Sequence, residues 1–168
     1  MPVNPPDDVD LIVAAWQRER PDLDVAPLQV LSRVSRLAKR LDLARAGAFA
    51  GLGLEIWEFD VLAALRRTGA PYRLSPGALV EATLVTSGTM TNRVDRLLAR
   101  ELVTRRPSPT DRRGVLVELT PAGVRAVDGA MEALLTRERA VLAGLSEADR
   151  RALTGFLREL QAGLDAPE

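Results

Sequence analysis

The chain contains no cysteine and no histidine among its 168 residues. Without cysteine there can be no disulfide, thiol nucleophile or thiolate metal ligand, and without histidine there is no imidazole base or ligand. These absences exclude zinc fingers, serine–histidine–aspartate hydrolases and the helical metalloprotease motif. The remaining serines and carboxylates form no catalytic pattern. We therefore expect a protein that is not an enzyme and needs no metal or other cofactor.

Aromatic residues are also scarce, at 4%, so alanine, leucine and valine must supply most of the core. No apolar run reaches the roughly 20 residues that cross a membrane. The first ten residues, MPVNPPDDVD, are acidic and proline-rich, unlike the basic start of a signal peptide. These features indicate a cytoplasmic protein, and its length suits one domain.

Positive charge is concentrated in one part of a chain that is neutral overall. The 23 basic residues balance 23 acidic ones, and Lys39 is the only lysine. Between Thr86 and Arg113, however, seven arginines face only three acidic residues, Asp95, Glu101 and Asp111. Any contact with DNA should therefore come from this segment rather than from the whole surface.

The basic segment begins with a predicted amphipathic helix. Thr86 and Ser87 are suitable helix caps. Apolar residues follow at helical spacing and form one stripe: Met90, Val94, Leu97 and Leu98. Short or planar hydrogen-bonding side chains occupy the other face: Ser87, Thr89, Thr91, Asn92, Asp95 and Arg96.

Two strand-like runs follow this helix, at 102–105 and 115–119, and a Pro/Ser/Thr/Asp/Gly segment between them predicts a hairpin. A capped polar helix followed by an arginine-tipped hairpin is typical of a winged helix-turn-helix on DNA. A helical adaptor that uses the basic patch for an acidic protein partner is the alternative. RNA binding is disfavoured because 86–113 lacks an aromatic residue for base stacking.

Caps, prolines and glycines delimit the other expected helices. Asp8 or Asp10 should begin the first, and the glycines at 47, 51 and 53 should break the second. After the hairpin, Thr120 as a cap and Pro121 in the first turn should begin a long helix. Four regions result: a disordered N-terminus (1–9), N-terminal helices for dimerisation and a possible ligand site (10–50), a winged helix-turn-helix domain (54–120), and C-terminal dimerisation helices (121–163). The outer helices have apolar stripes that a second copy of the chain would cover.

Three stretches together resemble the MarR family of bacterial transcriptional regulators: SGTMTNRVDRLLARELVTRR, the tip 111–114 (DRRG) and the exit 119–123 (LTPAG). The similarity extends roughly from Leu28 to Leu160. It implies a mainly α fold with a small β-wing, in which the N- and C-terminal helices form a dimerisation domain. It also implies a homodimer that regulates transcription by binding double-stranded DNA at a palindromic operator, as a repressor relieved by a small anionic ligand.

The amphipathic helix that begins at Thr86 and Ser87 is the predicted recognition helix, and its exposed face should contact base edges. Asn92 could pair with adenine and Arg96 with guanine, whereas Thr89 and Thr91 could donate a hydroxyl or contact a thymine methyl group. Ser87, at the helix start, suits a phosphate.

The hairpin tip should contact the neighbouring minor groove through Arg112 or Arg113. The resemblance matches Asp111 and Arg113 to the family's wing pattern. Asp111 would then orient Arg113 rather than act as an acid.

Four further residues resemble the urate-responsive subgroup of the family: Trp16, Asp60, Arg93 and Arg105. In that interpretation Trp16 stacks on a planar ligand such as urate or a carboxylic acid. Arg105 pairs with the anion, Asp60 accepts a ring N–H, and Arg93 transmits the change to the recognition helix. The alternative is structural: Trp16 anchors a helix, Asp60 and Arg105 form a salt bridge, and Arg93 contacts phosphate.

Overall fold

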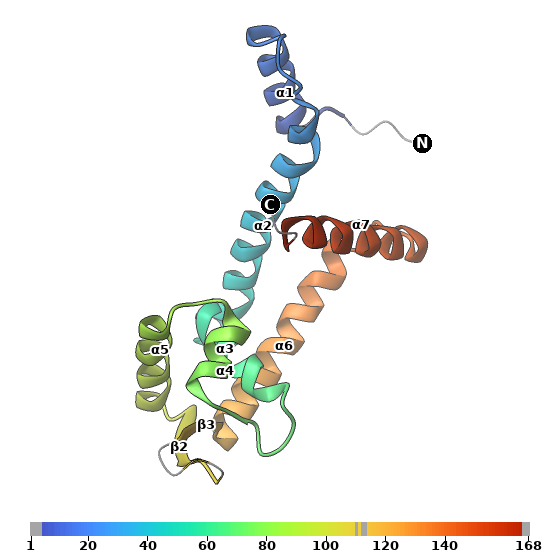
Figure 1. Ribbon diagram of the computed structural model, residues 1–168. Helices are drawn as coiled ribbons and strands as arrows, with labels where there is room; N and C mark the ends of the chain where they lie inside the picture. The colour runs from blue at the N-terminus through green and yellow to red at the C-terminus, as the bar shows by residue number, and fades with distance from the viewer. Residues whose placement is uncertain (1–4, 110, 112–113, 166–168) are drawn as a thin grey trace. The chain divides into compact units, whose positions relative to one another are not determined.

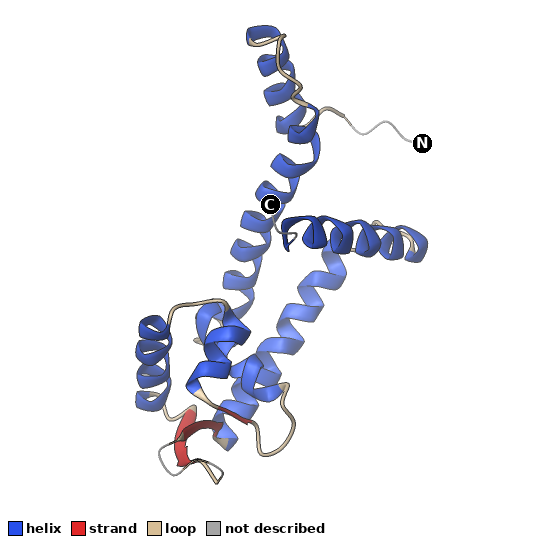
Figure 2. Ribbon diagram, in the orientation of Figure 1, coloured by secondary structure: helices blue, strands red, loops and turns tan. Residues whose placement is uncertain are grey.

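The structure, a computed structural model, describes residues 5–109, 111 and 114–165. Its elements, in chain order, are α1 (Asp8–Glu19), α2 (Ala26–Ala50), α3 (Ile56–Arg66), β1 (Arg73–Leu74), α4 (Pro76–Thr83), α5 (Ser87–Ala99), β2 (Val103–Pro107), β3 (Val115–Leu119), α6 (Pro121–Val141) and α7 (Glu147–Asp165) (Figure 1). The fold is mainly helical, as expected, and its three strands lie together in one small sheet (Figure 2). The chain divides into two compact units, one ending at Gly47 and the other beginning at Ala48.

The first unit contains α1 and most of α2. The Asp7 carboxylate caps α1 by accepting from the backbone N–H groups of Val9 and Asp10, at 2.8 and 3.1 Å. Val9 and Val13 are buried together with Val25. Helix α1 thus begins inside the 1–9 segment that we predicted to be disordered. The cap is Asp7 rather than Asp8 or Asp10, because capping and burial of Val9 order this turn.

Helix α2 ends at Ala50, directly before the predicted turn at Gly51 and Gly53, but it continues through Gly47, which was expected to break it as well. The physical reason lies in the second unit, where Phe49 is fully buried and stacks on Phe59 with ring centroids 4.6 Å apart. Burial of one aromatic ring gains more than a helical glycine costs, which is about 1 kcal/mol.

The core of the second unit is centred on α3, whose residues 58, 59 and 61–65 are all buried. Apolar side chains from α4, α5, both hairpin strands and α6 close around it: Leu79, Met90, Val94, Leu97, Val103, Val117, Leu119, Val127, Ala130 and Leu134. The apolar stripe predicted for the helix after Thr86, which is α5, therefore packs inward against α4, β2 and α3.

The three strands form an antiparallel sheet in the order β1–β3–β2. In the hairpin Val103 pairs with Leu119 and Pro107 with Val115, which confirms the predicted ribbon. The two-residue β1 was not predicted, because a strand this short has no periodicity to detect.

Helices α6 and α7 follow the sheet. Thr120 caps α6 by accepting from the N–H of Gly123, and Pro121 occupies the first turn, as the sequence predicted. Helix α7 leaves several large apolar side chains at least 38% exposed: Leu153, Phe156, Leu157, Leu160 and Leu164.

Candidate nucleic-acid interface

The recognition helix α5 starts at a side-chain cap. The hydroxyl of Thr86 accepts from the backbone N–H of Thr89 at 3.3 Å and lies 2.9 Å from the Thr89 hydroxyl. Ser87 is the first helical residue, is exposed, and its carbonyl accepts from the Thr91 hydroxyl at 3.1 Å. The cap predicted from sequence is confirmed. It leaves Ser87 exposed at the positive end of the helix dipole, where anions are favoured.

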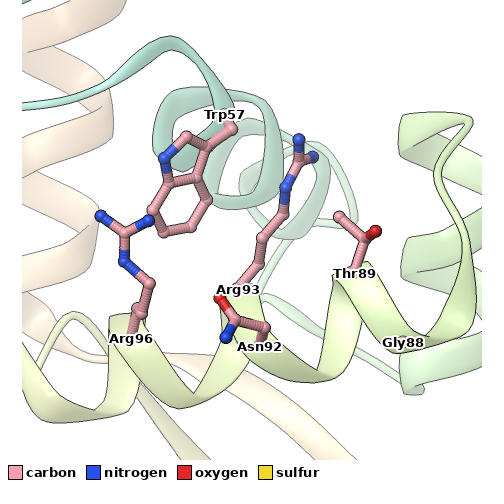
Figure 3. Close-up of a pocket in the computed structure, with 6 residues that line it drawn as sticks. All are labelled: Trp57, Gly88, Thr89, Asn92, Arg93 and Arg96. Atoms are coloured by element: carbon pink, nitrogen blue, oxygen red, sulfur yellow. The ribbon is translucent and has the colours of Figure 1, made fainter.

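The exposed side of α5 has two strips. Thr89, Asn92, Arg93 and Arg96 recur at helical spacing and, with Gly88, line an open pocket of about 440 Å³ beside Trp57 of α3 (Figure 3). The other strip, residues 87, 91 and 95, leads toward the hairpin through Asp95. Most of the predicted base-reading side chains therefore lie on one continuous exposed face.

Two arginines extend from α5 toward the Trp57 ring (Figure 3). The guanidinium carbon of Arg96 lies 4.6 Å from the ring centroid and that of Arg93 lies 5.6 Å away. Both distances fall within the range of cation–π attraction. The indole thus restrains two cations of the recognition helix.

Glu55, immediately before α3, completes this cluster. Its carboxylate accepts from the Trp57 indole N–H at 2.7 Å and from Nη2 of Arg96 at 2.6 Å. The indole hydrogen bond, followed by that of Arg96, lowers the pKa of the Glu55 carboxyl from its usual range. Glu55 is therefore charged at neutral pH and bridges Trp57 to Arg96.

The hairpin is tied to α5 at its base. Arg105 of β2 donates to the Asp95 carboxylate at 2.6 Å. At the tip, Ser108 and Gly114 share a backbone hydrogen bond of 2.8 Å, and the carbonyl of the exposed Asp111 accepts from the Gly114 N–H at 2.9 Å. The predicted contacts of Arg112 and Arg113 lie outside the described residues.

The C-terminal end of α5 is anchored by an ion pair whose carboxylate is buried. Arg100 donates through Nη1 to the Glu58 carboxylate and through Nη2 to the carbonyl of Gly53 at 2.9 Å. Glu58 is 1% exposed and also accepts from the N–H of Glu55 at 2.9 Å. The start of α3 thereby restrains the C-terminal end of the recognition helix, through Glu55 and Glu58.

The four predicted ligand residues are distributed as follows. Arg93 is half-buried beside Trp57, Arg105 pairs with Asp95 on α5, and Asp60 is half-buried on α3. Trp16, on α1 in the first unit, is 49% exposed. It therefore does not anchor α1 in the core of that unit, as the structural alternative required.

Sequence reasoning missed two members of the arginine cluster, Glu55 and Trp57. Trp57 occupies a regular apolar position of α3, and nothing in the local sequence distinguishes it from a core residue. Its scarcity was the one available signal, since the chain has only two tryptophans.

Among the described residues, no group of acidic side chains is arranged to hold a metal ion. In the same part of the chain, no helix combines the length and apolar character that a membrane span requires.

Comparison with known proteins agrees with this geometry. Residues 52–114 match the MarR family. The chain is 38% identical to the HTH-type transcriptional regulator PecS of Dickeya dadantii, over 94% of this chain and 95% of PecS. The chain belongs to the MarR family. It is also 32% identical to the HTH-type transcriptional repressor NicR of Pseudomonas putida, over 82% of this chain and 88% of NicR.

Among solved structures, this MarR-family protein resembles Bordetella bronchiseptica BpsR, with 31% identity and a TM-score of 0.60 over 77% of this chain and 98% of BpsR. The BpsR structure addresses regulation of DNA binding by 6-hydroxynicotinic acid. This MarR-family protein is thus a DNA-binding transcriptional regulator with a winged helix-turn-helix, and not an enzyme, as the sequence predicted.

Proposed function

We propose that this MarR-family regulator acts as a homodimeric repressor that binds a palindromic operator in the cytoplasm and releases it when a small anionic ligand binds. The observation that carries the proposal is the exposed face of α5, where Thr89, Asn92 and Arg96 stand together while the apolar stripe packs inward. Such a face fits the major groove, where amide and guanidinium groups distinguish base pairs.

Dimerisation is supported by the apolar side chains that the outer helices leave exposed. They include Leu31 of α2, 52% exposed, and Phe156 of α7, 62% exposed. A second copy would cover these faces and present two recognition helices to successive major grooves, about 34 Å apart. The operator should then have two-fold symmetry.

The roles of individual residues form part of the proposal. Asn92 reads adenine, Arg96 reads guanine, Thr89 and Thr91 contact base edges, and Ser87 binds phosphate. At the wing, Arg112 or Arg113 enters the minor groove and Asp111 orients Arg113.

Release of the operator by a ligand is supported by the two arginines, Arg93 and Arg96, beside the aromatic ring of Trp57. It is also supported by the regulation of DNA binding of BpsR by 6-hydroxynicotinic acid. Trp16, Asp60, Arg93 and Arg105 are the proposed ligand residues, and a planar anion such as urate or a carboxylic acid is the proposed ligand. A ligand that competes with the Arg105–Asp95 ion pair would change the link between wing and recognition helix.

Selection of bound fragments from genomic DNA tests the function. We expect a two-fold symmetric site of about 16 to 20 base pairs, bound by two copies of the chain. An asymmetric site, or one bound by a single copy, would contradict the dimer. Urate and citrate should then be titrated against the complex; if neither releases DNA nor raises the melting temperature, the proposed ligand class is wrong.

A further inference from the structure

Arg96 is unusual among the proposed base-reading residues because two partners at the start of α3 restrain it. One Nη2–carboxylate hydrogen bond of 2.6 Å joins it to Glu55, and its guanidinium lies 4.6 Å from the Trp57 ring centroid. Glu55 is in turn fixed by the 2.7 Å hydrogen bond from the Trp57 indole. The hydrogen bond and the ring together restrain the guanidinium.

These restraints leave most of the guanidinium available. The side chain of Arg96 is 53% exposed, and that of Glu55 is 56% exposed. A guanidinium has five N–H donors, of which this contact with Glu55 uses one. Two further donors can still form the bidentate pair with O6 and N7 of guanine that arginine makes in the major groove.

We propose that Glu55 is a specificity-determining positioning residue: with Trp57 it holds the Arg96 guanidinium in the orientation that reads guanine and keeps it from phosphates. The proposal rests on the proposed function, in which α5 reads the operator. An unrestrained arginine has many rotamers and pairs readily with phosphates at any sequence. A held arginine loses less entropy on binding guanine, and its carboxylate partner repels misplaced phosphates.

Loss of the Glu55 carboxylate should change the affinity for operator DNA and the affinity for unrelated DNA in opposite directions. Replacing Glu55 by glutamine should weaken binding to the operator, because glutamine has one acceptor oxygen in place of two and no negative charge, and therefore restrains Arg96 less. The same change should strengthen binding to unrelated DNA, because it removes one negative charge that would lie close to the DNA phosphates. An exposed ion pair of this kind corresponds to roughly a two- to five-fold change in affinity.

The experiment measures dissociation constants for the selected operator and for a scrambled duplex of equal length, by fluorescence anisotropy at several salt concentrations. The proteins are the wild type, Glu55→Gln, Arg96→Gln and the double variant. Glu81→Gln is the matched control, since it removes the same charge from exposed α4 without contacting Arg96. Thermal unfolding checks that each variant remains folded.

We expect Glu55→Gln to lower the operator-to-scrambled affinity ratio roughly two- to ten-fold, whereas Glu81→Gln leaves that ratio unchanged. The effect of Glu55→Gln on this affinity ratio should disappear in the Arg96→Gln background. A ratio unchanged in Glu55→Gln, or a change that persists without Arg96, would overturn the proposal. A wild type that binds both duplexes equally would instead refute sequence-specific reading, which is the proposed function itself.

Discussion

Gly123 lies so close to Leu102 that a Cβ atom on the glycine would stand 2.0 Å from the Leu102 carbonyl oxygen. The same carbonyl accepts from the backbone N–H of Thr120 at 3.1 Å and lies 3.2 Å from its hydroxyl. The start of α6 is thereby joined to the start of the wing hairpin through backbone atoms. A side chain at position 123 would separate the two.

Gly123→Ala should therefore destabilise the protein by more than about 2 kcal/mol, because backbone atoms have to move. Urea unfolding measures the loss. Gly129→Ala is the control on the same helix: a Cβ atom there would meet nothing within 4 Å, so it should stabilise by up to about 1 kcal/mol. Equal effects of the two substitutions would contradict the close approach.

Glu101 adopts a left-handed conformation, with φ of 56°, directly after the last turn of α5. Glycine has no Cβ and takes this conformation without strain, so Glu101→Gly should raise the free energy of unfolding by about 0.5 to 1 kcal/mol. Glu101→Ala keeps the strain and should give no gain. If alanine stabilises as much as glycine, the effect comes from the glutamate side chain instead.

The buried carboxylate of Glu58 depends on Arg100. Arg100→Met keeps the aliphatic stem but leaves Glu58 without its cation, which should cost about 1 to 3 kcal/mol, since Arg100 is partly exposed. Adding Glu58→Gln should recover part of this loss. A double-mutant cycle from urea unfolding gives the coupling energy, and strictly additive costs would rule out the ion pair as the cause.

In the first unit, hydrogen bonds from Arg33 are the main cause that lowers the pKa of Asp7 from 3.8 to about 2. A lowered pKa in the folded state means that this carboxylate stabilises the unit above about pH 4 and that the contribution is lost as pH falls toward 2. Carbon-13 NMR titration of Asp7 should show a midpoint near 2. Arg33→Gln should raise that midpoint toward 3.8.

Asp22 is the internal reference for this titration. Arg20 lowers the pKa of the Asp22 carboxyl through a direct hydrogen bond, which Arg33 does not share. Its midpoint should therefore stay low in Arg33→Gln. A parallel shift of both carboxyls would point to a general change of the unit.

Asn92 is exposed on α5 and lines the pocket with Arg96. If its amide pairs with adenine, Asn92→Ala should weaken operator binding by about 1 to 3 kcal/mol and relax the preference at one position of each half-site. Competition with operators altered at single positions measures both effects. Glu132→Ala, on the exposed surface of α6, should change neither.

The sequence predicted features that depend on local order. Thr86 and Thr120 were identified as caps, and the stripe of Met90 and Val94 was identified as buried, because capping and helical spacing involve residues only a few positions apart. The hairpin followed from strand-like runs around a turn segment. The resemblance to the MarR family rested on the same contiguous motifs.

Contacts between distant residues could not be predicted in this way. Helix α2 continues through Gly47, which was expected to help break it, because the packing of Phe49 on Phe59 outweighs the local preference of that glycine. The pairing of Arg105 with Asp95, rather than with Asp60, depends on how β2 leaves α5.

The sequence alone determined that this is a helical, winged DNA-binding protein with an arginine-rich segment at 86–113, because periodicity, caps and local charge depend on residues that are close along the chain. Only the tertiary structure decided which groups hold those arginines. Glu55 and Arg96 are 41 positions apart, and they meet because α5 packs on α3 through a shared core that local sequence does not encode.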